Sequence, residues 1–296
     1  MIPELYRDSL KALMVIILLT ILNFNLPILS LFIYIIWPIP IAYIVVKHGM
    51  KRAILLIIVA AVVNGLIMGA VMGLYTVIGF GLIGFILGAS LEEGFSPLKT
   101  LLLTIFAVLI SNLIIAGTTS YIFGFSYNQL FNDLIKSLGQ SPEFSHLSVV
   151  LEQQLNLIKR IFPAITVITS IITGSLTYYA TLWYLKRMGL EQKVYKPVKY
   201  WRFPHWWVSL GIVISLLFKT NIYLLNLNII LLFLAALQGF GVGLFYLTKG
   251  NYPPFLTFTY ILIIVLFNLF SFIILALVGL VDMWFNLRKI KLNPEG

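Results

Sequence analysis

The sequence has no cysteine and very few charged residues. The absence of cysteine excludes disulfide bonds, thiolate metal sites and cysteine nucleophiles. Only 10% of the 296 residues are charged, whereas soluble domains carry about 25%. Hydrophobic residues make up 60% of the chain, and the mean hydropathy is +1.02. These values exclude a soluble domain and indicate a chain that lies largely within a membrane.

Motifs for catalysis and for nucleotide or metal binding are also missing. No G-x-x-x-x-G-K-S/T pattern occurs, so the chain has no phosphate-binding loop of this type. The three histidines fall in separate loops, and no pair of nucleophile and base is recognisable. Apart from Asp282, no acidic residue lies inside an apolar run, which argues against a proton-coupled pump. We therefore expect a non-enzymatic protein with no cofactor and no metal site.

Apolar runs recur from Leu10 to Phe285 and predict an all-α fold. Most of these runs approach the length of about 20 residues that a helix needs to cross a bilayer. The sequence thus predicts a polytopic integral membrane helical bundle with about 8–10 transmembrane segments. The predicted segments are residues 10–22, 28–46, 53–72, 74–89, 100–123, 161–185, 208–218, 221–247 and 255–285.

The segments group into three predicted parts. Residues 1–187 form a six-segment bundle, which contains an amphipathic insert at residues 126–160. This insert has helical spacing but too many polar residues to span, so we expect it on the extracytoplasmic surface. Residues 188–205 form a basic cytoplasmic linker, and residues 206–296 add further C-terminal membrane segments.

The excess of positive charge indicates topology rather than nucleic-acid binding. The formal net charge is +10, and the Lys and Arg residues gather in short loops such as 47–52 and 186–202. This is the positive-inside pattern of membrane proteins, and anionic lipid headgroups are the natural partners of such charges. We expect a multi-pass protein of the bacterial cytoplasmic membrane with both termini in the cytoplasm.

The number of crossings stays open at the level of sequence. Nine single crossings from a cytoplasmic N-terminus would leave Arg288, Lys289 and Lys291 outside, against the positive-inside rule. A re-entrant segment at residues 206–219 would give eight crossings, and a last run broken near residues 268–271 would give ten. Asp282, near the end of that run, is expected to pair with Arg288 or Lys289.

Glycines dominate the stretch of residues 60–94. Gly65, Gly69 and Gly73 lie four residues apart, so on one helix they would share a face, and Gly84 and Gly88 repeat this spacing. Small residues at such spacing let membrane helices approach closely, so we interpret them as packing residues beside a cavity or docking face. The adjacent acidic pair, Glu92 and Glu93, is a candidate for partner docking, with an ordinary solvated loop as the alternative.

Polar residues on the fifth and sixth segments suggest a ligand site. Their spacing in the sixth segment places hydroxyl groups on one helix face. Two such faces would line a polar cavity that opens to the outside, although hydroxyls inside helices also bond to the carbonyl four residues earlier. The side-chain amides of Asn64 and Asn112 need hydrogen-bond partners when they are buried at membrane depth. The candidate ligand-binding residues are Asn64, Ser111, Asn112, Thr118, Thr166, Thr169, Ser170 and Thr173.

Several blocks of the chain resemble the YybS-like family of bacterial membrane proteins of unknown function. The blocks are WPIPIAYIVVKHGMKRA, GFGLIGFILGASLEEGFSPLKT, the segment ending YLKRMG, ALQGFGVGLFYL and GLVDMWFNLRK. The first six segments also resemble, more distantly, the S components of energy-coupling-factor transporters. That second resemblance implies a bundle that binds a small metabolite and works with a coupling membrane subunit and separate ATPases. The alternative hypothesis is a scaffold or regulatory protein that docks another membrane or envelope protein.

Overall fold

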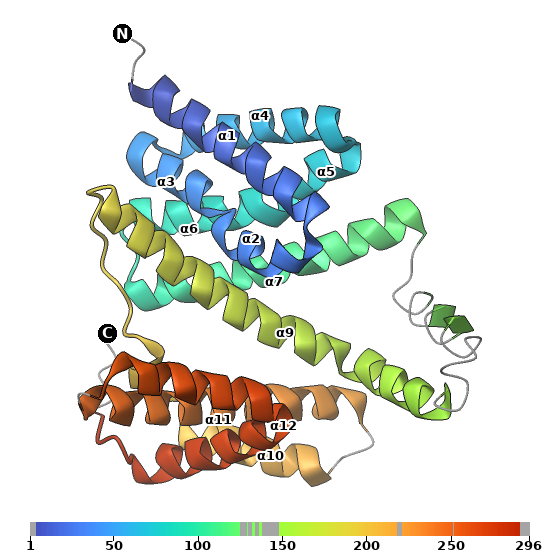
Figure 1. The fold of residues 1–296 in the computed structure, drawn as a ribbon, viewed down its shortest axis with the longest axis vertical. Coiled ribbons are helices and arrows are strands. Elements are labelled where there is room, and N and C mark those ends of the chain that lie inside the picture. The colour runs from blue at the N-terminus through green and yellow to red at the C-terminus, as the bar shows by residue number, and fades with distance from the viewer. Residues whose placement is uncertain are drawn as a thin grey trace. The chain divides into compact units, whose positions relative to one another are not determined.

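The computed structural model describes residues 4–124, 129, 132–133, 136–137, 148–217, 221–250 and 252–290, and these residues contain helices but no strand (Figure 1). The all-α membrane bundle is therefore confirmed. The described part of the chain contains six helices that are long and apolar enough to cross a membrane, and two shorter apolar helices at residues 32–48 and 205–215. Those six are Met50–Met68, Ala70–Glu92, Pro97–Ile122, Gln153–Arg187, Ile222–Lys249 and Pro254–Phe285.

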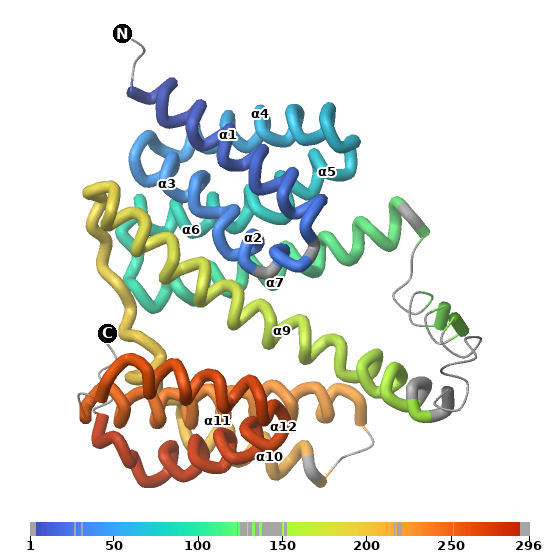
Figure 2. Tube along the Cα trace, in the orientation of Figure 1, coloured from blue at the N-terminus to red at the C-terminus, as the bar shows by residue number. Residues whose placement is uncertain are grey.

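The chain forms two compact units. The colour of the tube in Figure 2 gives the residue number, so the ranges of each unit can be located there. Unit 1 consists of residues 1–130 and 169–195, and unit 2 of residues 131–168 and 196–296. The helix α9 (Ser148–Arg187) contributes its first half to unit 2 and its second half to unit 1. The other elements of unit 1 are α1 (Glu4–Asn25), η1 (Pro27–Leu29), α2 (Ser30–Ile36), α3 (Ile39–His48), α4 (Met50–Met68), α5 (Ala70–Tyr75), η2 (Thr76–Gly81), α6 (Leu82–Glu92) and α7 (Pro97–Phe123).

Two of the predicted segments of unit 1 are interrupted. The run 28–46 divides into α2 and α3 at Trp37 and Pro38, where proline removes a backbone donor. The predicted stretch of residues 53–72 ends early, because Gly69 adopts a φ of 97° that strongly favours glycine. The turn between the two antiparallel helices thus lies at Gly69 and not at residues 72–74. Beyond it, α5, the π-helical turn η2 and α6 form one continuous span.

The glycine contacts correct the predicted ladder. Because the helix ends at Gly69, that residue does not stack with the other two, and Gly65 and Gly73 instead face each other across the turn. A Cβ atom on Gly73 would lie 2.7 Å from the carbonyl oxygen of Ala61 and 3.2 Å from Gly65 Cα. The helices at this turn therefore pack with their backbones almost in contact.

The second glycine pair packs α6 against α3. A Cβ atom on Gly84 would lie 2.8 Å from Ile41 Cβ, and one on Gly88 would lie 2.6 Å from Val45 Cβ. The WPIP block therefore supplies the helix that these glycines contact. Glu92 and Glu93 are exposed at the end of α6. Their role in docking stays a prediction.

The amphipathic insert of residues 126–160 lies partly outside the described residues. From Ser148 onward, however, the chain is helical without a break through to Arg187. The second amphipathic stretch is therefore not a separate surface helix but the beginning of the sixth segment. Inside this helix, Pro163 disturbs the backbone hydrogen bonds, and the Asn226 amide compensates. It accepts from the Ala164 N–H (2.8 Å) and donates to the Arg160 carbonyl (2.9 Å).

The remaining elements of unit 2 are η4 (Val198–Tyr200), α10 (His205–Leu217), α11 (Ile222–Lys249) and α12 (Pro254–Phe285). The chain of α12 leaves the helical conformation at Asn268, where φ is 35° and ψ is −105°. Tyr260, before this break, stacks on Phe240 of α11.

Beyond the break, the second limb of α12 runs in the same direction as α11. Gln238 there contacts Asp282, and further along α11 the Tyr246 hydroxyl donates to the Leu287 carbonyl. The limb before Asn268 runs opposite to α11. It begins at Pro254, a few residues after α11 ends at Lys249, and Tyr260 further along it stacks on Phe240, which lies well before the end of α11. The chain thus folds back at Asn268, which is the break that the ten-crossing alternative requires. Each limb is shorter than the roughly 20 residues of a full crossing.

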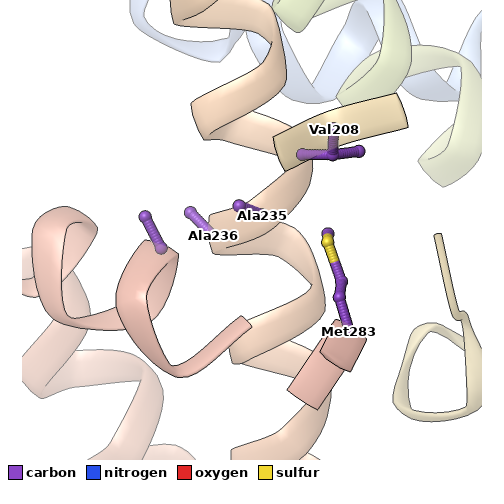
Figure 3. Close-up of a cluster of buried hydrophobic side chains, with 5 residues drawn as sticks. Val208, Ala235, Ala236 and Met283 are labelled. Carbon is purple, nitrogen blue, oxygen red and sulfur yellow. The ribbon is translucent and has the colours of Figure 1, made fainter. Parts of the chain in front are cut away.

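Small side chains allow these helices of unit 2 to pack closely. Figure 3 shows the cluster, in which Ala235 and Ala236 of α11 lie near Val208 of α10 and Met283 of α12. Ala276 of α12 belongs to the same cluster. Its members are all buried. Alanine and glycine at these positions keep the helix axes near one another, as expected for packing between membrane helices.

A buried ion pair connects the end of α12 to η4 and α11. Asp282 and Arg288 side chains have no exposed surface, and the Arg288 Nη2 atom lies 2.8 Å from the Asp282 carboxylate. Arg288 also donates to the backbone carbonyls of Lys199 and Trp201, each at 2.7 Å. Gln238 donates to the same carboxylate at 2.7 Å. Of the two partners that the sequence left open for Asp282, the structure selects Arg288.

Candidate functional site

The predicted polar face of the fifth and sixth segments comes together around Asn112 in unit 1. The Asn112 side chain accepts a hydrogen bond from the Tyr34 hydroxyl (2.9 Å) and donates to the Ser170 hydroxyl (3.2 Å). Ser111 is fully buried and donates to the Gly79 carbonyl at 3.1 Å. These contacts join α7, α9, α2 and the π-helical turn, so the polar groups bind one another at the helix interfaces.

The hydroxyls of the same face differ in their surroundings. Thr118 donates to the Ile114 carbonyl at 2.8 Å and Thr166 to the Phe162 carbonyl at 3.0 Å, which is the back-bonding alternative. Thr166 belongs to the part of α9 in unit 2, whereas Thr169 lies in unit 1 and is exposed. Thr173 is buried. A ligand at these residues stays a prediction.

Asn64 lies apart from Asn112, in a different polar network. Its amide nitrogen donates to Thr20 of α1 (3.1 Å) and to Thr76 of the π-helical turn (2.9 Å). The Trp37 indole donates to the same Thr20 hydroxyl at 3.0 Å. Thr20, Asn64 and Thr76 are all buried. Their hydrogen bonds link α1, α4 and the π-helical turn. Thr20 and Thr76 did not stand out in the sequence.

A second cluster, which sequence reasoning missed, centres on Asp8 near the start of α1. The Lys47 ammonium at the end of α3 donates to Glu4 (2.6 Å), Asp8 (2.8 Å) and the Tyr43 hydroxyl (3.0 Å). His48 Nε2 lies 3.1 Å from the same Asp8 oxygen. Asp8 is 7% exposed, whereas Glu4 is exposed. The cluster therefore ties the beginning of α1 to the end of α3.

This cluster changes the acidity of its members. The hydrogen bond from Lys47 lowers the pKa of Asp8 to about 2, with further bonds from His48 and Tyr43 acting in the same direction. The pKa of Lys47 is raised, chiefly by its hydrogen bond to Asp8. Asp8 and Lys47 are therefore both charged at neutral pH and form a persistent ion pair.

The lowered pKa of Asp8 predicts a specific dependence of stability on pH. Because the folded pKa lies below the unfolded value, this stabilisation is complete above about pH 4 and disappears as the pH falls through about 2. Thermal unfolding in detergent should therefore show that the wild-type protein loses stability as the pH falls from about 5 to about 2. In Asp8→Asn this loss between the two pH values should be smaller. Glu92→Gln, which removes an exposed carboxylate, is the control. An unchanged slope in Asp8→Asn would contradict the assignment.

A cavity of about 650 Å³ lies beside this cluster, entirely within unit 1. Four helices form it: α1, α2, α3 and the second half of α9, together with Met188 just after the end of α9. Asp8, Tyr43 and Lys47 line it together with two more cations of α1. The full lining is Arg7, Asp8, Lys11, Ala12, Val15, Ile36, Ile39, Pro40, Tyr43, Lys47, Ala180, Trp183, Tyr184 and Met188.

The volume and lining of this cavity suit a ligand. Small-molecule sites usually measure about 300–1,000 Å³ and combine apolar walls with a few polar groups. Another hollow, of about 630 Å³, is lined only by α7 and its N-terminal cap residue, so it is a depression of one helix surface. Among the residues that the structure describes, no group of three or more His, Asp or Glu is placed to hold a metal ion.

Comparison with known proteins places the chain in a family. Residues 12–283 match the family described as "Predicted membrane protein (DUF2232)", which covers most of the chain. The chain belongs to this family. It is also 26% identical over 162 residues to "Uncharacterized protein YybS" of Bacillus subtilis, a match that covers 52% of each protein. The YybS-like resemblance is thereby confirmed, and no solved structure matches the chain.

Membership of this DUF2232 family establishes an integral membrane protein, and a chain embedded in this way contacts lipid. The cavity residues Arg7, Asp8 and Lys11 had a weak signal in the sequence, because they lie close together at the polar start of an amphipathic helix. Lys47, the partner of Asp8, follows 39 residues later in the chain. No local pattern connects two helices at that separation.

Proposed function

We propose that this DUF2232 protein is a non-enzymatic membrane protein that binds a small solute in the cavity of unit 1. The observation that carries the proposal is the cavity itself, with a volume of about 650 Å³ and a wall shared by four helices. The role resembles that of an S component, which binds a solute while a coupling subunit and separate ATPases supply energy. Residence in the bacterial cytoplasmic membrane, with both termini in the cytoplasm, is part of this proposal.

The charged residues of the cavity support binding rather than catalysis. A general base works best when its pKa lies near the operating pH. The pKa of Asp8 is about 2, and its carboxylate accepts hydrogen bonds from Lys47 and Tyr43. Asp8 is therefore a weak base at neutral pH and acts as a structural anion that holds Lys47 in place.

Filling the cavity tests the proposal. The wild-type protein in detergent should gain thermal stability from at least one member of a panel of water-soluble vitamins and anionic phospholipids. Ala180→Phe, which places a ring in the cavity, should weaken this stabilisation at least about tenfold in ligand concentration. Ala70→Phe adds the same ring at an exposed position of α5 and should leave it unchanged.

Two results would change the assignment. If Asn112→Ala abolishes ligand stabilisation and Ala180→Phe does not, the ligand binds at the polar face of α7 and α9. If no compound stabilises the wild-type protein, solute binding is wrong. In that case the scaffold alternative predicts that Glu92→Gln with Glu93→Gln releases a protein partner that co-purifies with the wild type.

A further inference from the structure

The lining of the unit 1 cavity is graded from charged to apolar along its helices. On α1, Arg7 and Lys11 come first and Val15 follows one helical turn later. On the α2–α3 segment the order is reversed, since Ile36 comes before Lys47. The bonds of Lys47 to Glu4 and Asp8 place the end of α3 beside the start of α1. All charged groups therefore lie at one end of the cavity.

The charged end is positive. Three cations against one carboxylate leave the lining with a formal charge of +2, and counting the nearby Glu4 reduces it to +1. Lys47 uses its three donors on Glu4, Asp8 and Tyr43. Arg7 is 60% exposed, and its nearest ion-pair distance, to Asp8, is 4.0 Å. Arg7 and Lys11 thus retain donors for an anion.

The location of these two cations is not explained by helix stability. Positive side chains stabilise the C-terminal end of a helix, whereas Arg7 and Lys11 lie in the first turns of α1. The positive-inside rule accounts for cations at this end of the chain, but not for their position on the wall of a cavity. They lie four residues apart and so share one helix face, which directs both toward the same space.

The other end of the cavity is suited to a hydrocarbon chain. Val15 and Ile36 line it and are 42% and 45% exposed. In a membrane protein such side chains face lipid or a lipid-like ligand. The Tyr43 and Tyr184 rings contact each other edge to face, with their centroids 5.8 Å apart. Because the Tyr43 hydroxyl bonds to Asp8 and Lys47, these rings lie next to the charged end. Aromatic groups of this kind favour the boundary between headgroup and chain.

From this gradient we infer that the cavity binds an anionic phospholipid, with the phosphate at Arg7 and Lys11 and an acyl chain along Val15 and Ile36. The inference rests on the proposed function and names its ligand class. Arg7 supplies a planar guanidinium that matches two phosphate oxygens, and Lys11 supplies a second charge. The Asp8–Lys47 pair joins α1 to the end of α3 on the wall of the cavity.

Lipid titration of the purified full chain in detergent tests this inference. Phosphatidylglycerol should raise the melting temperature, phosphatidylcholine with the same chains should do so much less, and glycerol 3-phosphate should have no effect. Arg7→Gln with Lys11→Gln should increase the phosphatidylglycerol concentration required by about tenfold or more. Lys51→Gln with Lys193→Gln removes two exposed cations of unit 1 outside the cavity lining and should change it little.

The outcomes separate this inference from the proposed function. Equal losses in the two double variants would show a general charge effect and overturn the phosphate site. Stabilisation by glycerol 3-phosphate equal to that by the lipid would overturn the role of the acyl chain. If Ala180→Phe blocks the binding of a vitamin but leaves phosphatidylglycerol binding intact, the lipid site is wrong while solute binding stands. If no compound responds to Ala180→Phe, the cavity function itself is wrong.

Discussion

Arg288→Met is expected to destabilise unit 2 by about 3–5 kcal/mol, because it leaves the Asp282 carboxylate buried without its counter-charge. The substitution also removes the donors for the carbonyls of Lys199 and Trp201. Both members of the pair have no exposed side-chain surface, so solvent does not compensate for the loss. Thermal or denaturant unfolding in detergent measures the effect.

The double variant is the informative control for this prediction. Asp282→Asn with Arg288→Met removes both charges, and Gln238 keeps a polar partner at residue 282. We expect this variant to be more stable than Arg288→Met alone, since no uncompensated buried charge remains. Lys289→Met, three residues beyond the C-cap Asn286 and at an exposed position, should have a small effect. Equal stability of Arg288→Met and Lys289→Met would contradict the assignment.

Gly279→Ala should have an effect of similar size, about 3 kcal/mol or more. A Cβ atom at Gly279 would overlap the carbonyl oxygen of Ala235 and lie 2.8 Å from the Gly239 nitrogen. Both neighbours are backbone atoms of α11, so no side-chain rotation relieves the overlap. The helices α11 and α12 would have to separate, which would open the cluster shown in Figure 3.

The same substitution at an open position provides the control. Gly117 lies in α7, and a Cβ atom there meets nothing within 4 Å. Gly117→Ala should therefore leave the apparent melting temperature unchanged or raise it slightly, because alanine favours the helical state. A Gly279→Ala protein as stable as the wild type would show that α11 and α12 do not approach at this point.

The predicted glycine ladder shows where local pattern fails. The spacing of Gly65, Gly69 and Gly73 is correct for one helix face, but Gly69 adopts a positive φ and ends the helix. Sequence spacing does not reveal which glycine of a series bends the chain. The conformation is selected by the packing of Gly65 against Gly73, which exists only after the chain has turned.

The Asp282 pair and the Asp8 cluster differ in how far apart in the sequence their members lie. Asp282 and Arg288 are six residues apart at a helix end, so the pairing was predictable from sequence. Asp8 and Lys47 are separated by 39 residues, and only the packing of α1 against α3 brings them together. The polar face around Asn112 was predictable as a stripe, but its partner Tyr34 was not, being 78 residues away.

The sequence by itself determined the class of protein: apolar runs and scarce charge are local properties, and their transfer free energy commits the chain to a helical membrane fold. Only the tertiary structure decided the turn at Gly69, the fold-back at Asn268, the Asp8–Lys47 pair and the cavity beside it. The physical reason is that these features depend on which helix faces meet. Many pairings bury similar apolar surface, and close backbone contacts and hydrogen-bond partners select among them.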